Sequence, residues 1–387
     1  MNLNKLLIRP DDVSTSVRPE LVEGLASNHI STSSMRTDFK YHRAGAKVVG
    51  KNNFDLLRFL FAVTVLLVHS YVLSDAHALS ILSKLLSSEL AVKCFFIVSG
   101  FLIFMSYENT DHNGQFFLKR ARRIYPAYFS VVLLCVLFGS VFATCSFSEY
   151  WSFPTLKYII ANLIFLNFLQ PNLPGLFEGN TLQAVNGALW TLKIEVMFYL
   201  FVPLAVMAFR RFGRLRVLFF LYISSVVYSL IVFEIARRTG VGAFLELQRQ
   251  LPGQLTYFIA GATGYYYFEY LSKRAVWLVA LALVAFALQA WLPWLAVEPL
   301  AIGILVVYFA CIFPYLGNFG KYGDFSYGVY IVHFPILQIF VSYGLFKSSP
   351  WMALSLSGLV ILTVAVFFWN FIEKPFLRKS SHYVAVT

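Results

Sequence analysis

A long apolar stretch near the start of the chain, residues 54–73, constrains the fold more than any other feature. It reads FDLLRFLFAVTVLLVHSYVL. As a helix, twenty residues at about 1.5 Å each cross the roughly 30 Å hydrocarbon core of a bilayer. Of the 387 residues, 59% are hydrophobic and only 13% are charged. Because charged residues make up about 25% of a soluble domain, the sequence predicts a polytopic membrane protein.

Similar apolar stretches recur along the chain and predict an all-α integral membrane protein with about ten transmembrane helices. We expect these spans at residues 54–73, 89–107, 124–143, 189–209, 217–235, 255–271, 275–291, 300–316, 326–345 and 351–372. Residues 156–169 are too few to cross and include two asparagines, which favours one short re-entrant or interfacial segment. If that segment does not cross, most basic clusters face the cytoplasm, as do both termini.

The two ends of the chain differ from this apolar region. Residues 1–50 are polar and contain no apolar stretch, so they form no signal peptide and are expected to be a disordered extension. A short regulatory tail is the alternative reading, and Met35 is a plausible alternative start. Residues 51–378 form the predicted membrane domain, and 379–387 are a short cytoplasmic tail.

The net charge of +12 does not indicate a nucleic-acid-binding protein. The basic residues stand mainly in short loops between apolar stretches, as the positive-inside rule and anionic lipid headgroups require, so we expect membrane lipids as contacts and no nucleic acid. The four cysteines lie mainly in apolar stretches without paired spacing. We interpret them as packing residues and expect neither a disulfide nor a bound metal.

The first apolar stretch carries ionisable residues that a simple lipid-facing helix would lack. Asp55 and Arg58 stand at its start, and His69 follows eleven residues after Arg58. Eleven helical residues bring the direction back to within about 20°, so Arg58 and His69 share a face, about 16 Å apart along the axis. Ionisable groups inside a membrane are costly and indicate a functional site. The alternative for His69 is a histidine that packs between helices.

Four more segments carry polar residues beside or inside predicted spans. They are FLKRARRIYPAY (117–128), ALWTLKIEVMFYL (188–200), SYGVYIVHFPI (326–336) and FIEKPF (371–376). In this order, together with the first stretch, they resemble the bacterial membrane acyltransferase family 3, over roughly residues 52–378. Each motif alone is weak, whereas the ordered set is specific.

The resemblance implies a bacterial inner-membrane enzyme that takes an acyl group, usually acetyl, from cytoplasmic acyl-CoA and passes it to an acceptor at the outer face. Acyl-CoA is then a co-substrate, and no bound cofactor is expected. By this resemblance Arg58 and His69 match the family's arginine–histidine pair, with His69 essential. Transfer from a thioester to a hydroxyl needs a base near neutral pKa or a nucleophile that carries the acyl group briefly. Both roles remain open for His69.

The basic run is the predicted binding site for the acyl-CoA phosphates, through Lys119, Arg120, Arg122 and Arg123. The family often has arginine at the first and last of the five positions 119–123, whereas this chain has Lys119 and Arg123. Lysine keeps the charge but lacks the two-pronged guanidinium, and Arg120 is a candidate substitute. The alternative is that these cations only set the membrane topology.

Glu195 is predicted as a third catalytic residue, near the outer side, where it orients the acceptor hydroxyl or holds the histidine. The alternative is a carboxylate paired with Lys193 or reaching the interface. The predicted supporting residues are Asp55, Trp190, Tyr199, Tyr330 and His333. His333 contributes to the acyl-donor path or is a structural histidine bonded to a tyrosine or to the backbone.

The sequence therefore predicts an O-acyltransferase acting on a saccharide or glycolipid acceptor. The chain has no predicted extracytoplasmic hydrolase-like domain, so the acyl group is transferred within the membrane domain or passed to a separate extracytoplasmic acyl-acceptor protein. A transporter or flippase of a glycan precursor, with Arg, His and Glu forming a proton or substrate path, is the alternative. A noncatalytic assembly subunit is a third reading.

Overall fold

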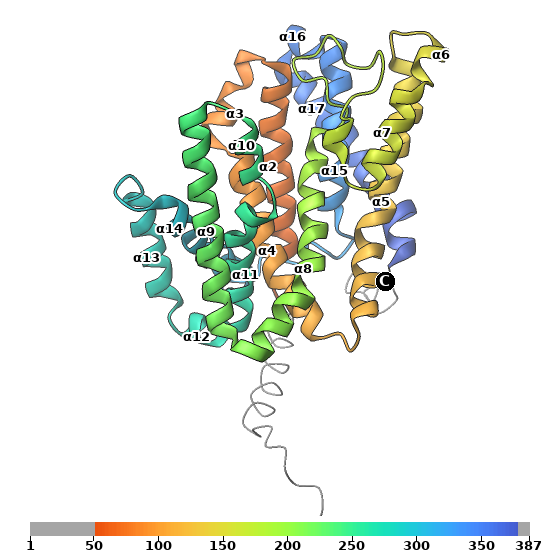
Figure 1. The fold of residues 1–387 in the computed structure, drawn as a ribbon. Helices are drawn as coiled ribbons and strands as arrows, with labels where there is room; N and C mark the ends of the chain where they lie inside the picture. The colour runs from red at the N-terminus through yellow and green to blue at the C-terminus, as the bar shows by residue number, and fades with distance from the viewer. Residues whose placement is uncertain (1–50, 378–387) are drawn as a thin grey trace, which may run out of the picture. The chain divides into compact units, whose positions relative to one another are not determined.

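The computed structural model describes residues 51–377. The predictions for residues 1–50 and for the tail 379–387 lie outside these residues. Every regular element of the described residues is helical, in agreement with the predicted all-α membrane class (Figure 1). The protein is therefore an all-α integral membrane protein.

Sixteen α-helices build this region, most of them joined by short turns. They are α2 (Phe54–Ser74), α3 (Ser80–Leu85), α4 (Ser88–Glu108), α5 (Asn113–Phe142), α6 (Phe147–Tyr150), α7 (Phe153–Leu163), α8 (Trp190–Phe212), α9 (Arg214–Thr239), α10 (Ala243–Gln248), α11 (Leu251–Tyr266), α12 (Phe268–Lys273), α13 (Ala275–Ala287), α14 (Trp294–Cys311), α15 (Phe325–Ser342), α16 (Leu345–Ser348) and α17 (Pro350–Phe368). A π-helical segment, Trp369–Glu373, extends α17.

Each of the ten predicted spans corresponds to a helix. Within the described residues, eight helical segments are long and apolar enough to cross a membrane by length and composition. The other two, α11 and α13, have 16 and 13 residues. Helix α7 has 11 residues, about 16 Å of rise, so it is too short to cross alone, as expected for the segment near residues 156–169.

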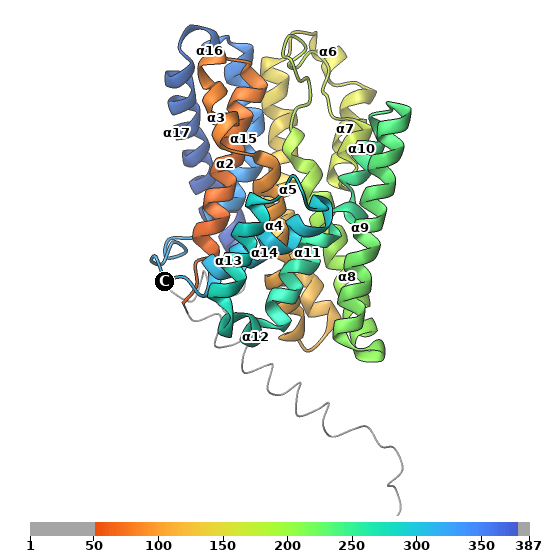
Figure 2. The same ribbon diagram turned by 90° about the vertical axis from the view of Figure 1, so that its left-hand side faces the viewer.

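Helix α4 lies inside the bundle, between α2 and α11 (Figure 2). Its contact with α11 depends on glycines from both helices. A β-carbon on Gly100 would lie 2.0 Å from the carbonyl oxygen of Phe258, and one on Gly261 would lie 1.9 Å from that of Ile97. The two backbones approach closely because these side chains are absent, a common arrangement between membrane helices.

Helix α15 packs between α2 and α17 (Figure 2). Helices α2 and α15 both begin at the end of the bundle where the π-helical extension of α17 finishes. We call this the arginine end, defined by Arg58, Arg123 and Asp324. Helix α12 and the start of α5 lie toward the same end in Figure 1, whereas α3, α6 and α16 lie at the opposite one.

The chain between α7 and α8, residues 164–189, turns back into the bundle. The Asn180 side-chain amide donates to the Gln338 backbone carbonyl at 3.1 Å, and that of Asn186 donates to the Ile331 carbonyl at 2.8 Å. Both acceptors belong to α15, so the segment lies against the middle of that helix. Helix α8 therefore starts at a depth within the bundle and not at its surface.

Candidate functional site

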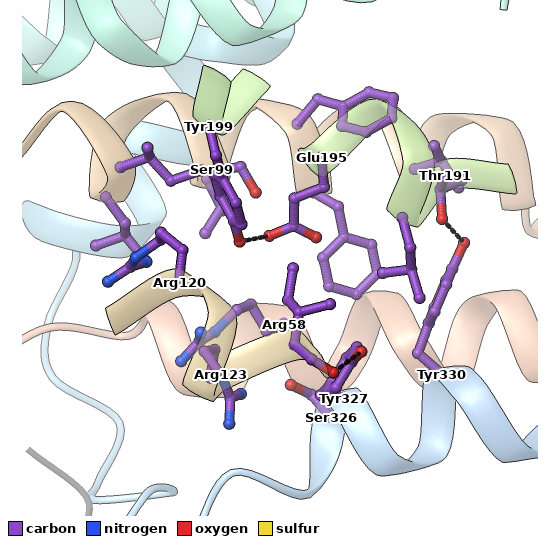
Figure 3. Close-up of a pocket in the computed structure, with 18 residues that line it drawn as sticks. Arg58, Ser99, Arg120, Arg123, Thr191, Glu195, Tyr199, Ser326, Tyr327 and Tyr330 are labelled. Atoms are coloured by element: carbon purple, nitrogen blue, oxygen red, sulfur yellow. Dashed lines mark hydrogen bonds between the residues drawn. The ribbon is translucent and has the colours of Figure 1, made fainter. Parts of the chain in front are cut away.

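A cavity lined by both polar and apolar side chains lies among α2, α4, α5, α8 and α15 (Figure 3). Its volume is about 120 Å³. Its polar lining consists of Arg58, Ser99, Arg120, Arg123, Thr191, Glu195, Tyr199, Ser326, Tyr327 and Tyr330. The three arginines lie toward one end of the cavity, and Thr191 and Tyr330 lie at the other (Figure 3). The cavity thus joins a cationic end to a hydroxyl-lined end.

Two residues of the basic run reach this cavity because the run is helical. Helix α5 begins at Asn113, so the expectation that this run precedes a span starting at Ile124 is wrong. Pro126 accordingly lies inside the helix and not in its first turn. Positions 120 and 123 are one turn apart and share a face, so both arginines line the cavity.

The other two predicted phosphate ligands lie elsewhere. The Lys119 ammonium donates to the Thr110 hydroxyl at 3.0 Å, and neither Lys119 nor Arg122 lines the cavity. Arg120 donates to the Ser106 hydroxyl at 3.1 Å and lies 5.9 Å from the centre of the Tyr199 ring. No carboxylate pairs with Arg120 among the described residues, and its Nε has no hydrogen-bond partner there. Of the three arginines that line the cavity, Arg120 is thus the one available to pair with a negatively charged ligand.

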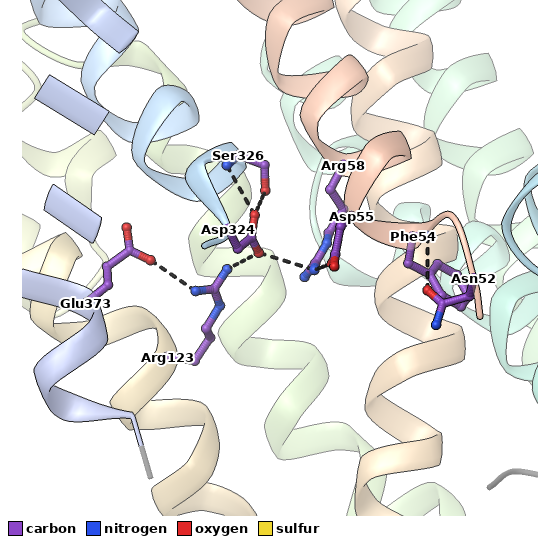
Figure 4. A network of polar contacts seen from close by, with 8 residues as sticks. All are labelled: Asn52, Phe54, Asp55, Arg58, Arg123, Asp324, Ser326 and Glu373. Atoms are coloured by element: carbon purple, nitrogen blue, oxygen red, sulfur yellow. Dashed lines mark hydrogen bonds and ion pairs between the residues drawn. The ribbon is translucent and has the colours of Figure 1, made fainter. Parts of the chain in front are cut away.

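Arg58 and Arg123 belong to a buried ionic network at the arginine end (Figure 4). Asp324, at the start of α15, pairs with both guanidinium groups, and its contact with Arg58 measures 3.2 Å. Asp55 pairs with Arg58 from one helical turn away, and Glu373 accepts from Arg123 at 3.0 Å. The network joins four helices that are far apart in the sequence.

Asp324 precedes its span and is nearly fully buried, with 3% of its surface exposed. Burial alone would raise the pKa of its carboxyl group. The guanidinium groups of Arg58 and Arg123, and hydrogen bonds from Ser326, outweigh that effect and lower the pKa to about 2. Asp324 is therefore a carboxylate at any physiological pH, and it holds the two arginines at the mouth of the cavity.

Glu195 lies in the same cavity as the arginines, so its predicted place near the outer side is wrong. It accepts a hydrogen bond of 2.5 Å from the Tyr199 hydroxyl one turn along α8. Thr191 and Tyr330 bond through their hydroxyls at 2.7 Å, which sets α8 at the height of the second turn of α15. Glu195 is one turn closer to the arginine end than Thr191. Glu195 lies this close to the arginine end because residues 164–189 turn back into the bundle before α8 begins.

Lys193 and Trp190, which stand near Glu195 in the sequence, do not line the cavity. Lys193 lies 4.9 Å from the centre of the Phe168 ring and makes no ion pair with Glu195. Trp190 starts α8 and lies against Arg249, 6.0 Å from the ring centre, without lining the cavity. Glu195 also makes no contact with His69 among the described residues, so it does not hold that ring.

His69 forms a pair with His333, beyond the hydroxyl-lined end of the cavity. The Nδ1 of His69 lies 2.9 Å from the Nε2 of His333, and the two ring centres are 5.1 Å apart. The Nδ1 of His333 in turn lies 2.7 Å from the backbone carbonyl oxygen of Tyr330. Tyr330 thus connects the cavity lining to the histidine pair.

The two histidine rings differ in exposure. His333 is fully buried, whereas His69 is half-buried. The ring of Phe334 lies edge-on to His69, with centres 5.7 Å apart. His69 is therefore held on two sides, while the residue as a whole is only half-buried.

Sequence reasoning missed Asp324, Glu373 and Tyr327 as residues of this site. Asp324 carries a readable signal, because an aspartate directly before an apolar run is typical of a helix N-cap, and here it accepts from the Ser326 amide. Glu373 directly follows the last apolar stretch, and its motif by itself indicates only the end of a helix. Tyr327 lies three residues before Tyr330 on the same face.

Comparisons with known proteins give one matching family and several relatives. The sequence profile of the acyltransferase domain of acyltransferase family 3 matches residues 51–370. The chain is 28% identical over 336 residues to the O-acetyl transferase of Shigella phage Sf6, covering 85% of this chain and 97% of that protein. It is 26% identical over 360 residues to Nodulation protein 10 of Rhizobium leguminosarum bv. viciae, covering 87% and 95%. No solved structure matches the chain significantly.

Proposed function

Since the chain belongs to acyltransferase family 3 and is a membrane acyltransferase, we propose that it moves an acetyl group from acetyl-CoA to a saccharide hydroxyl. The observation that supports this most directly is the cavity with arginines at one end and Tyr330, next to the histidine pair, at the other. The relative named O-acetyl transferase supports acetyl as the acyl group.

The arginine end is the proposed entry for acyl-CoA. Guanidinium groups bind phosphate oxygens through paired N–H donors, which suits the phosphates of CoA. Arg58 and Arg123 are held by Asp324, and Arg120 has no carboxylate partner among the described residues. Arg120 therefore supplies the main phosphate contact, while the thioester arm extends along the cavity toward Tyr330.

We place the arginine end in the cytoplasm, at the inner membrane of a bacterium. Basic residues flank the turn between α8 and α9, and Lys273 and Arg274 lie where α12 meets α13. Both lie at the same end of the bundle as the start of α5 in Figure 1. By the positive-inside rule that side is cytoplasmic. Acyl-CoA then approaches from the cytoplasm, and the acceptor saccharide, free or lipid-linked, approaches from the other side.

His69 is the proposed catalytic residue. The acceptor oxygen attacks the thioester carbonyl carbon, its proton passes to the imidazole, the C–S bond breaks, and the thiolate takes up the proton to leave as CoA thiol. Alternatively, the imidazole nitrogen attacks first and carries the acyl group to the hydroxyl. Both routes end with the same ester and free CoA.

Transfer of label from radioactive acetyl-CoA tests this function. Full-length protein in nanodiscs is incubated with the glycolipid and polysaccharide fraction of cells that lack the gene. We expect label in that fraction with the native protein and with His77→Ala, an exposed histidine outside the site, and none with His69→Ala. Equal labelling by His69→Ala would overturn the assignment. If the protein transfers no label but takes up glycans when placed in sealed proteoliposomes, the transporter alternative is correct.

A further inference from the structure

The direction of hydrogen-bond donation within the histidine pair is fixed, because one of the four ring nitrogens faces backbone carbonyl oxygens. The Nδ1 of His333 lies 2.7 Å from the carbonyl oxygen of Tyr330 and 3.3 Å from that of Val329. A carbonyl oxygen only accepts hydrogen bonds. The Nδ1 of His333 must therefore carry a proton and donate it.

His333 is neutral in this setting. Its ring is fully buried, and no carboxylate pairs with either histidine among the described residues. Burying an unpaired charge costs far more than burying a neutral ring. With its proton on Nδ1, neutral His333 has a lone pair on Nε2.

The protonation of His69 follows from that of His333. The Nε2 of His333 accepts, so the Nδ1 of His69, 2.9 Å away, must donate. A neutral His69 then carries its proton on Nδ1 and a lone pair on Nε2. That Nε2 has no hydrogen-bond partner within residues 51–377, and it is not fully buried. It is therefore open to an incoming group.

From this chain of donors we infer that His333 is a positioning residue that fixes His69 in the tautomer whose Nε2 reacts. The inference rests on the proposed role of His69 and names the nitrogen that performs it. A base oriented by a third group is a recurring device of acyl-transfer sites. Here the third group is a second imidazole anchored on the backbone of α15, and no carboxylate is used.

The hydrogen bond from His69 to His333 also stabilises His69 while it takes the proton of the acceptor hydroxyl. When Nε2 takes the proton of the acceptor hydroxyl, His69 becomes an imidazolium whose Nδ1–H still donates to His333. A hydrogen bond from a charged donor is stronger than one from a neutral donor. The positive charge is then passed on as the proton that leaves with the CoA thiolate. His333 itself touches no substrate and keeps its proton throughout.

Three substitutions of His333 separate positioning from packing. A glutamine amide oxygen reaches the place of Nε2 and accepts from His69, so His333→Gln is expected to keep kcat within about fivefold. Asparagine reaches only the place of Nδ1, and phenylalanine fills the volume without accepting. Both are expected to lower kcat by about 100-fold or more, on the scale of other catalytic histidines in the wrong tautomer. The KM for acetyl-CoA is expected to stay within about threefold of the native value, because the phosphate contacts are unchanged.

The direct readout is the nitrogen-15 NMR spectrum of the native protein labelled at histidine, in nanodiscs. The signals of His69 and His333 are identified by replacing the other five of its seven histidines with glutamine. We expect a protonated Nδ1 and an unprotonated Nε2 on both rings. A protonated Nε2 on His69 would overturn the inference even if the variants fail to fold.

The kinetic outcomes keep this inference separate from the proposed function. Loss of activity in His69→Ala with full activity in His333→Phe would overturn the tautomer role and leave the function standing. Full activity in His69→Ala would overturn the function itself. Low kcat in His333→Phe with rescue by His333→Gln supports the inference.

Discussion

Asp324 lies 3.2 Å from Arg58, although the two residues are far apart in the sequence. The same carboxylate also pairs with Arg123 on α5. One buried acid therefore positions two of the three arginines that line the cavity. The start of α2 and the start of α15 are held together at the point where the proposed donor enters.

Replacing Asp324 is expected to destabilise the protein in a pH-dependent way. The folded-state pKa is about 2 and the ordinary value 3.8. This group's stabilisation is therefore present above pH 3.8 and is lost as the pH falls toward 2. A pKa lowered by one corresponds to about 1.4 kcal/mol, so the ionised form contributes about 2 kcal/mol. Asp324→Asn should lose at least this much at pH 7, measured by unfolding in detergent.

The pH dependence distinguishes an ionic role from general damage. The gap in stability between native protein and Asp324→Asn should narrow below pH 4, because the native carboxyl then becomes neutral too. Asp111→Asn, at an exposed position, is the matched control and should unfold like the native protein. A gap that stays constant from pH 7 to pH 3 would contradict this account.

The close contact of α4 with α11 gives a second prediction, on packing. In Gly261→Ala the new β-carbon would lie 1.9 Å from the Ile97 carbonyl oxygen, so the helices must separate. Overpacking of this kind costs about 1–3 kcal/mol and more against a rigid backbone. We expect a clear drop in unfolding temperature in detergent for Gly261→Ala.

Gly358 on α17 is the matched control for this test. A β-carbon there meets nothing within 4 Å, and alanine is the better helix former by about 1 kcal/mol. Gly358→Ala should therefore be neutral or slightly stabilising. Equal behaviour of the two variants would mean that the glycine contact does not hold α4 against α11.

Much of this fold could be predicted because hydropathy reports helices directly. The spans, the short helix α7 and the pairing of Arg58 with His69 on one face of α2 all follow from local spacing. The predicted start at Ile124 is wrong because the charges before it suggest a loop. A transmembrane helix can continue beyond the bilayer, and the first turns of α5 contain the basic run.

The depth of Glu195 could not be predicted for a different reason. It depends on residues 164–189 turning back against α15, through side-chain amides such as Asn186 that bond to a distant helix. Hydropathy does not report such contacts. The partnership of His69 with His333 is equally non-local, so sequence alone leaves the role of His333 open.

A third prediction concerns a buried ion pair away from the site. Lys93 on α4 lies 3.0 Å from Glu298 on α14, with 16% and 12% of their side chains exposed, and Tyr257 donates to Glu298 at 2.8 Å. Lys93→Met leaves the carboxylate buried without its main cation, which costs about 3–5 kcal/mol. Adding Glu298→Gln removes the charge and keeps an acceptor for Tyr257, so the double variant should recover most of the loss.

Lys273→Met provides the surface control for that pair. Lys273 and Glu269 lie 3.1 Å apart, and each side chain is 67% exposed. Exposed pairs contribute about 0–1 kcal/mol, so this substitution should leave the unfolding temperature almost unchanged. If Lys93→Met behaved like Lys273→Met, the buried pair would not hold α14 against α4.

The final prediction compares two neighbouring arginines of α5. Arg120 lines the cavity and has no carboxylate partner among the described residues, whereas Arg122 lies outside the cavity. A charge-assisted hydrogen bond contributes about 1.5–3 kcal/mol, so Arg120→Ala should weaken acetyl-CoA binding by about 10- to 100-fold. Arg122→Ala removes the same charge and should change the dissociation constant by less than about twofold.

The measurement is equilibrium binding of radiolabelled acetyl-CoA to full-length protein at two salt concentrations. Raising the salt screens charges in solution, so it should weaken native binding more than Arg120→Ala binding if Arg120 contacts a phosphate. Arg120→Lys keeps the charge without the two-pronged donor and should fall between the native protein and Arg120→Ala. Equal losses in Arg120→Ala and Arg122→Ala would show that the run acts only through its net charge, and the cavity would then not be the entry for the donor.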